Sequence, residues 1–150
     1  MARDERRWQA GGGTAVAVAA GRSRVGYAAQ TKGGAVTRAD LLAYCLAKPG
    51  AWQDEPWESD VVAKVGSKIF VFLGSDDARA IGLKCGPNRD VANEWLLRYP
   101  RDATVMAYVG RSGWNSLRIG GAIPDDELLE AVDASYEAVL AKLPKRDRPR

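Results

Sequence analysis

Residues 60–73 have the sequence DVVAKVGSKIFVFL, and this stretch decides the fold. Its first half alternates as a strand with one buried side does. The buried side would carry Val61, Ala63 and Val65. Gly66-Ser67 is a two-residue hairpin signal, after which residues 68–73 form a nearly continuous apolar strand. The stretch therefore predicts an antiparallel hairpin in which Lys64 faces away from the core.

A helix is predicted before this hairpin. Thr37 is its N-cap, and Asp40, three residues later, can return the contact in a variant of the capping box. The helical stripe consists of Leu41, Leu42, Cys45 and Leu46. Pro49-Gly50 ends the helix, and residues 51–59 are interpreted as an irregular segment.

Two further strands and a second helix continue the pattern. Residues 79–85 alternate, so that Lys84 faces out together with Ala80 and Gly82. Gly86-Pro87-Asn88 opens a helix, which Pro100 ends. Residues 103–109 and 114–119 are expected to pair as a second hairpin around a turn at 111–113.

The last predicted element is a helix with Pro124 at its first position. Acidic residues crowd its first turn, where the helix dipole favours negative charge. Its apolar stripe consists of Leu128, Val132, Tyr136, Val139 and Leu143. The resulting order, α-β-β-β-α-β-β-α, predicts a single α+β domain in which helices flank an antiparallel sheet.

Charge divides the chain into three parts. Residues 1–36 and 142–150 each carry a net charge of +4, whereas residues 37–141 hold 11 basic and 16 acidic residues. Residues 1–36 lack a periodic apolar pattern and cannot bury enough surface to offset their ordering entropy. We interpret 1–36 as a disordered extension, 37–144 as the folded domain and 145–150 as a frayed basic tail.

Valine at position 36 can be encoded by GTG, an alternative bacterial start codon. We hypothesise that the natural protein starts there with methionine, which the intact mass of the natively expressed protein would test. The competing interpretation is a basic tail that helps to hold nucleic acid. The N-terminal apolar run at 15–20 is short and lacks leucine, which disfavours a secretory signal.

The expected compartment is the cytoplasm. No apolar run approaches the roughly 18 residues of a membrane helix. Cys45 and Cys85 lie forty residues apart and fit two reduced thiols, as a reducing compartment maintains. The chain has no histidine and no CxxC spacing, which excludes the usual zinc patterns.

No catalytic residue is predicted, and the chain is not expected to be an enzyme. Without histidine a common general base is missing. The sequence contains no P-loop, GxGxxG or GxSxG motif. Asp76-Asp77 is interpreted as a pair that solvates a hairpin loop. We therefore expect no cofactor, no metal and no small-molecule substrate.

The strongest candidate surface is the 110–118 hairpin. If Leu117 faces the core, then Trp114 and Arg118 share the outer face of the strand, with Arg111 in the turn before them. Arginine beside an exposed aromatic ring suits phosphate contact and base stacking. The alternative is a packed tryptophan that Arg118 covers through a cation–π contact.

Further basic residues extend this nucleic-acid hypothesis. Lys64 and Lys84 are expected on outward strand positions, where ordinary solubilising lysines are the alternative. The densest basic run is the C-terminal one, which includes Lys142, Lys145 and Arg146. Such runs bind nucleic acid without sequence preference or serve solubility alone.

Several segments, taken in order from about 37 to 146, resemble the MmcQ/YjbR family. They include Leu41-Leu42-Ala43-Tyr44-Cys45-Leu46-Ala47-Lys48-Pro49-Gly50-Ala51, Lys64-Val65-Gly66-Ser67-Lys68-Ile69-Phe70, Leu83-Lys84-Cys85, Gly113-Trp114-Asn115-Ser116-Leu117 and Ile123-Pro124-Asp125-Asp126-Glu127-Leu128. The resemblance implies a fold like that of bacterial frataxin-type (CyaY-like) domains, also described as a double wing. It also implies a DNA-binding role, and it adds Asn115 to the candidate contacts.

Two functional hypotheses follow. The first is a DNA-binding module that uses Arg111, Trp114, Arg118 and the basic tail. The second is a protein-interaction or cation-binding domain that uses the acidic last helix. Its candidate residues are Asp125, Asp126, Glu127, Glu130 and Asp133. A solvated helix face matched to the dipole explains the same acids without a ligand.

Overall fold

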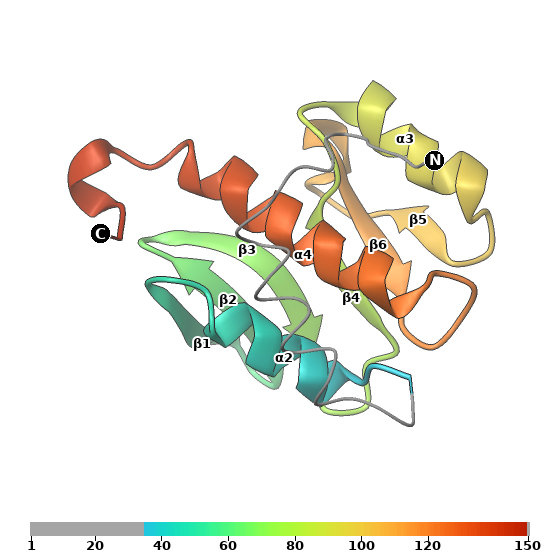
Figure 1. The fold of residues 1–150 in the computed structure, drawn as a ribbon, viewed down its shortest axis with the longest axis horizontal. Helices are drawn as coiled ribbons and strands as arrows, with labels where there is room; N and C mark the ends of the chain where they lie inside the picture. The colour runs from blue at the N-terminus through green and yellow to red at the C-terminus, as the bar shows by residue number, and fades with distance from the viewer. Residues whose placement is uncertain (1–34, 150) are drawn as a thin grey trace. The chain divides into compact units, whose positions relative to one another are not determined.

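The predicted hairpin at 60–73 is formed by β2 (Asp60–Val65) and β3 (Lys68–Gly74) (Figure 1). The structure is a computed structural model, and it describes residues 35–149. The interpretation of residues 1–34 as disordered, and the start hypothesis that depends on it, lie outside this part. Val36 was assigned to the extension, but its side chain is buried and its N–H donates to Asp125 Oδ2 at 3.0 Å. The packed unit therefore begins ahead of Thr37.

The segment predicted to be irregular is a strand, β1 (Ala51–Trp57). It pairs antiparallel with β2, and its register shifts between Asp54 and Trp57. This shift, together with Pro56, breaks the two-residue period by which a strand is recognised in a sequence. Pro56 is tolerated because β1 is an edge strand of the sheet.

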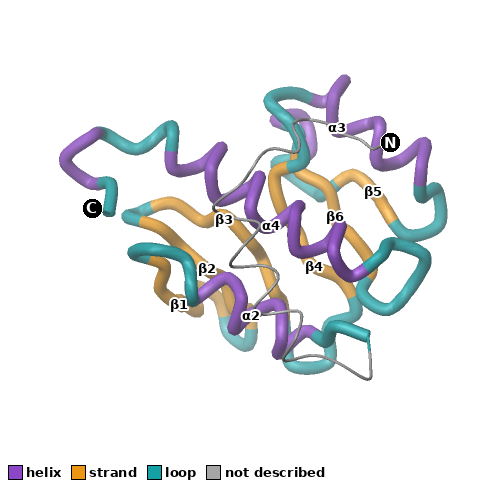
Figure 2. The backbone as a smooth tube through the Cα atoms, in the orientation of Figure 1, coloured by secondary structure: helices purple, strands orange, loops and turns teal. Residues whose placement is uncertain are grey.

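The sheet has six strands in the order β1-β2-β3-β4-β6-β5, and every neighbouring pair is antiparallel (Figure 2). The other strands are β4 (Ala80–Lys84), β5 (Ala103–Val105) and β6 (Trp114–Arg118). The α+β prediction is confirmed, with β1 added. The strand expected at 103–109 is shorter, because the chain leaves the sheet after Val105 and enters the 3-10 helix η1 (Gly110–Ser112).

Three α-helices accompany the sheet: α2 (Arg38–Leu46), α3 (Arg89–Arg98) and α4 (Asp125–Leu140). The predicted capping box is confirmed, because Thr37 and Asp40 satisfy each other's backbone N–H groups. Asn88 caps α3 through its side chain. Pro124 is the N-cap of α4, so the helix begins one residue later than predicted. None of the helices within residues 35–149 is long and apolar enough to cross a bilayer.

The helices pack on one face of the sheet, which we call the inner face. Phe70 of β3 meets Tyr136 of α4 edge to face, with ring centroids 5.2 Å apart. Asn115 of β6 donates to the Ala92 carbonyl of α3. The largest fully buried side chains include Tyr44, Phe70, Leu41, Leu73, Ile81, Leu83, Leu117, Leu128 and Leu129. The opposite face of the sheet, the outer face, carries no α-helix in the described part of the chain.

One helix side chain enters the sheet itself. The β3–β4 ladder is in register only at Val71↔Leu83 and Phe72↔Gly82. At the next position the Lys84 N–H donates to Ser135 Oγ at 3.0 Å, and Ser135 Oγ donates to the Phe70 carbonyl at 2.6 Å. The buried hydroxyl of α4 thus satisfies two backbone groups where the strands separate.

A charged pair joins the turn after α2 to α4. Lys48 Nζ donates to Asp133 Oδ1, and Tyr44 Oη donates to the same oxygen at 2.8 Å. The two charged side chains are about nine-tenths buried. Because a buried charge is tolerated only when it is paired, this contact fixes how the two helices meet.

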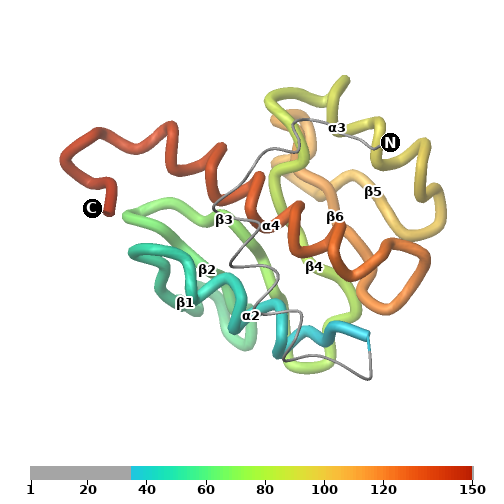
Figure 3. The backbone as a smooth tube through the Cα atoms, in the orientation of Figure 1, coloured from blue at the N-terminus to red at the C-terminus, as the bar shows by residue number. Residues whose placement is uncertain are grey.

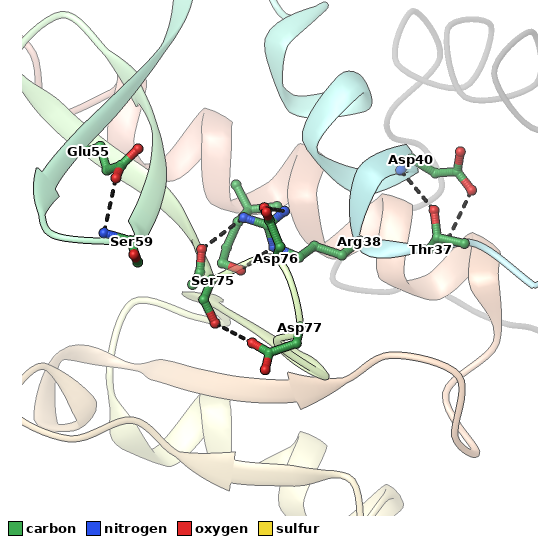
Figure 4. Close-up of polar contacts among 10 residues, drawn as sticks. Thr37, Arg38, Asp40, Glu55, Ser59, Ser75, Asp76 and Asp77 are labelled. Atoms are coloured by element: carbon green, nitrogen blue, oxygen red, sulfur yellow. Dashed lines mark hydrogen bonds and ion pairs between the residues drawn. The ribbon is translucent and has the colours of Figure 1, made fainter.

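Figure 4 shows the polar contacts at the start of α2 and the loop after β3. Arg38 donates to the carbonyls of Leu73 and Gly74, and its guanidinium lies 3.5 Å from Asp76. Ser75 donates to Asp77 at 2.6 Å, and this hydrogen bond lowers the pKa of Asp77. The two aspartates have separate partners, as expected of a loop and not of a catalytic pair.

The C-terminus was predicted to be frayed, and this was wrong. Residues 145–147 form the 3-10 helix η2 (Lys145–Asp147). The Arg148 guanidinium donates to the carbonyls of Leu143 and Ala141, both at 3.0 Å. Leu143 packs on Gly66, so the tail folds back onto the β2–β3 turn (Figure 3). The prediction rested on the basic composition of this segment, which does not indicate that Arg148 hydrogen-bonds to nearby carbonyls.

Candidate nucleic-acid interface

Strand register identifies the side chains of the outer face, because directly paired residues point to the same side of a sheet. Trp114 pairs with Lys84, and Arg118 pairs with Ala80. Leu117, between them, is fully buried on the inner face. The prediction that Trp114 and Arg118 share the outer face is therefore confirmed.

An aromatic patch occupies the middle of the outer face. Trp114 and Phe72 are both half-buried, and their rings meet edge to face with centroids 5.6 Å apart. Met106 lies over Gly82, because a Cβ atom added to this glycine would come within 2.4 Å of the Met106 sulfur. We call Phe72, Met106 and Trp114 the central patch. Its half-buried rings leave part of their surface open to solvent.

A second aromatic site lies at the β1 edge of the same face. Trp52 is 43% exposed, and its indole N–H donates to the Gly66 carbonyl at 2.9 Å. Lys64, its cross-strand partner, places Nζ 4.8 Å from the ring centroid and 3.1 Å from Asp54 Oδ2. The hydrogen bond from Lys64 lowers the pKa of Asp54. We call Trp52, Asp54 and Lys64 the edge patch.

Lys84 was predicted to be an exposed cation, and this was wrong. Only 6% of the residue is exposed, and Nζ donates to the Ser112 carbonyl at 2.6 Å. Burial lowers the pKa of Lys84, and the positive charge of Lys142 lowers it further. The register of β4 with β6 pairs Lys84 with Trp114, and the Lys84 side chain reaches the Ser112 carbonyl in η1. It supports the turn and does not present its charge.

Asn115 is also not a surface contact. It is fully buried on the inner face, where it accepts a hydrogen bond from Arg89 and donates to the Ala92 carbonyl at 2.9 Å. It therefore ties β6 to α3. Side chains alternate along a strand, so Asn115 points to the same inner face as Leu117. The sequence alone therefore argued against Asn115 as a DNA contact.

The two predicted arginines are exposed at opposite ends of β6. Arg111 stands in η1, next to the Ser112 carbonyl that receives Lys84. Gly113, in a left-handed conformation with φ of 94°, connects this turn to Trp114. Arg118 closes the strand on the outer face. Together they flank the central patch with positive charge.

The C-terminal cations are exposed, as predicted, and they belong to an ordered segment. Lys142 lies near enough to Lys84 to affect its titration. Lys145 and Arg146 stand in η2, whose Asp147 carbonyl approaches the β2–β3 turn at Gly66. The structure thus brings Lys142 towards the Lys84 and Ser112 region, while η2 reaches the edge patch side of the sheet.

Negative charge gathers in the helix layer. Helix α4 contains six acidic residues and no basic one. Several of them already have partners: Asp125 accepts from Val36, and Glu127 accepts from Arg98 at 2.9 Å and from Tyr99 at 2.7 Å. Burial, followed by Glu127, raises the pKa of Tyr99 to about 12. Within residues 35–149 no group of three or more potential metal ligands occurs.

Sequence reasoning missed three members of the outer face: Trp52, Phe72 and Met106. Trp52 was hidden because its strand was not predicted. Phe72 lies in an all-apolar run, where the period gives no indication of which side chain is buried. Register shifts in β2–β3 then decide that Phe70 faces inward and Phe72 outward. Pairing residues 51–54 with β2 as a hairpin would have placed residue 52 opposite Lys64, and so would have predicted that Trp52 lies on the outer face.

Comparisons with known proteins agree on one family. The family model described as YjbR matches residues 46–138. The uncharacterized protein YjbR of Escherichia coli K12 is 30% identical over 116 residues, which cover 75% of this chain and 95% of the relative. The same protein of Escherichia coli O157:H7 matches equally. A crystal structure of a Deinococcus radiodurans protein with the domain DUF419 has a TM-score of 0.65 at 22% identity. It covers 74% of this chain and 84% of that protein, and it supports the fold alone.

Proposed function

The chain belongs to the YjbR family, and from this premise we propose that it is a cytoplasmic DNA-binding protein without catalytic activity. The outer face of the sheet is the proposed contact surface. Arg111 and Arg118 would meet phosphates, with Lys142, Lys145 and Arg146 extending the contact, while Lys64 stays paired with Asp54. Trp114 would meet bases or sugars.

The separation of charge between the two layers supports this proposal most directly. The net charge of residues 37–141 is negative, yet six of its 16 acids lie in α4, on the inner side of the sheet. Among the outward strand positions Asp54 and Asp60 are acidic, and Lys64 already neutralises Asp54. The polyanion would therefore meet Arg118, Arg111 and the central patch without facing the acidic helix.

The test is the salt dependence of duplex binding by the full chain. Fluorescence anisotropy of a labelled duplex, repeated over a series of salt concentrations, gives the slope of log affinity against log salt. Each phosphate contact contributes about 0.9 to that slope for duplex DNA. Replacing Arg111→Ala and Arg118→Ala together should lower the slope by about 1–2 and weaken binding to all sequences alike.

Arg101→Ala is the matched control. This residue is exposed and carries the same charge, but it stands in the turn before β5 and not on the outer face positions of β6. Its replacement should leave the slope unchanged. A slope that is equal in the parent chain and the double variant would reject the outer face as the DNA contact. An equal loss in Arg101→Ala would reject it too.

The acidic helix is the second candidate, as a protein-interaction or cation-binding surface. Its supporting observation is the run of acids on α4. Asp125, Glu127 and Asp133 are engaged with Val36, Arg98 and Lys48, which leaves this surface less suited to capture a cation. The outer face therefore carries the stronger proposal.

A further inference from the structure

We infer that the outer face binds DNA in single-stranded form, with unpaired bases stacked against its two aromatic patches. This inference rests on the proposed function and specifies the form of DNA that the same face takes. It depends on which elements are free to contact DNA and on how the aromatic rings are presented.

The described helices do not present a basic surface to a DNA groove. Proteins that read the major groove insert a helix or a two-stranded ribbon into it. Here α2 and α4 are joined across the inner face by Lys48 and Asp133, and α3 is held to β6 through Asn115. The exposed positions of α3 include Asp90 and Glu94, and those of α4 include Asp126 and Glu130, so the helix layer turns negative charge towards a polyanion. The surface left for DNA is the sheet itself.

The outer face presents aromatic rings to a ligand. A duplex lying on this face could meet the rings only with its sugar-phosphate backbone. Trp114 and Phe72 meet at an interplanar angle of 75°, so the pair offers ring surface in two orientations. Trp52 is held by its bond to the Gly66 carbonyl, which orients the indole at little further entropic cost. Aromatic side chains on an open sheet are the recurring platform for unpaired bases, whose faces a duplex keeps stacked inside.

The two patches are spaced along one path. They lie on β1 and β6, which are four strand intervals apart in the sheet, or about 19 Å at ~4.8 Å per interval. Lys64 stands beside the ring of Trp52, and Arg118 lies on the strand of Trp114. A single strand crossing the sheet would thus meet a ring at each end of its path, with Arg111 and Arg118 at the two ends of β6 to meet its phosphates.

The experiment compares three labelled ligands against the full chain at one salt concentration. They are an oligothymidylate of about 20 nucleotides, a duplex of the same length, and a strand of the same length whose sites are abasic. The abasic strand keeps the phosphates and removes the bases. We expect the oligothymidylate to bind at least about five-fold more tightly than either of the others. Its binding should also quench tryptophan fluorescence.

Two variants test the rings separately. Trp52→Ala removes a partly exposed ring from an edge strand, and Trp114→Leu keeps apolar volume against Phe72 while removing the indole. Each should weaken oligothymidylate binding about five-fold or more, with little effect on the abasic strand. Leu97→Ala is the control, because Leu97 is an exposed apolar side chain that lies on α3 and not on the sheet. Far-UV circular dichroism confirms that each variant is folded.

The outcomes separate this inference from the proposed function. Duplex binding that equals or exceeds oligothymidylate binding, and that Arg111→Ala with Arg118→Ala weakens, would overturn the single-strand inference and leave the proposed function standing. Abasic binding as tight as oligothymidylate binding would also overturn it, because bases would contribute nothing. A chain that binds none of the three ligands would overturn both.

Discussion

At the scale of single residues, whether a side chain can contact a ligand depends more on its burial than on the face of the sheet to which it belongs. Lys64 and Lys84 both occupy outer positions of the sheet, yet Lys64 lies along an indole at the surface while Lys84 is buried. The difference comes from a nearby acceptor, the Ser112 carbonyl, which turns the Lys84 ammonium inward. Equal positions in a strand therefore do not imply equal roles in binding.

The buried thiols predict a loss of stability at alkaline pH. Burial raises the pKa of Cys85 to about 12 and also raises the pKa of Cys45. An unfolded thiol ionises near its ordinary value of 9.0, so above that pH the unfolded chain loses protons that the folded chain retains. The stability is complete below pH 9 and should fall by about 1.4 kcal/mol per pH unit for each thiol as pH rises towards 12.

Urea unfolding at a series of pH values measures this effect. Replacing Cys45→Ala and Cys85→Ala should remove the decline between pH 9 and 10, whereas the raised pKa values of Tyr99 and Tyr136 leave a decline above their ordinary value of 10.0. Both thiols should resist alkylation in the folded chain and react after unfolding. A parent chain and double variant with the same pH slope would contradict the assignment.

At the scale of elements, the junction between η1 and β6 depends on one glycine. Gly113 adopts a φ of 94°, and a Cβ atom there would lie 2.4 Å from the Gly86 carbonyl oxygen. Gly113→Ala combines left-handed strain with a clash against backbone, and should lower the free energy of unfolding by about 2–4 kcal/mol. Thermal unfolding followed by circular dichroism provides the measurement.

Gly120→Ala isolates the clash from the strain. Gly120 also has a positive φ, of 78°, but nothing lies within 4 Å of the position its Cβ would take. This variant should lose only about 1–2 kcal/mol, the part due to left-handed backbone. Equal destabilisation by the two substitutions would show that the contact with Gly86 is unimportant.

Sequence patterns predicted elements better than they predicted the surface. Thr37 and Asp40, Gly66-Ser67 and Pro124 carry local signals, and each ends or begins an element within one residue of its predicted place. The strand β1 was not predicted, because Pro56 and a register shift interrupt the alternation of buried and exposed residues that identifies a strand. The candidate site depends on contacts distant in the sequence, such as Phe72 with Trp114 and Lys84 with Ser112. No periodicity within a single element encodes these pairings.

At the scale of the whole molecule, the two layers have opposite charge and should act independently. Asp126 and Glu130 are exposed acids of α4. Neutralising them by Asp126→Asn and Glu130→Gln should change DNA affinity by less than about threefold at physiological salt. The reason is that screening over ~8 Å separates the helix layer from the outer face. The same anisotropy assay measures this, and the paired Arg111→Ala and Arg118→Ala change is the contrast.

The same variant addresses the cation hypothesis. Calcium or ferrous ions added to the parent chain should leave the NMR signals of Asp126 and Glu130 in place, because neighbouring acids of α4 are already committed to protein partners. Shifts that saturate in the parent chain and vanish in the variant would instead establish α4 as a cation site.

The Ser135 hydroxyl gives the sheet a mechanical property. It sits at the seam between a half made of β1, β2 and β3 and a half made of β4, β6 and β5. The Phe72 and Trp114 rings straddle this seam from the opposite side. Only two residue pairs join β3 to β4 directly, so the hydroxyl of α4 holds the two halves of the sheet together where their ladder is shortest. Loss of this hydroxyl should loosen the sheet beneath both rings.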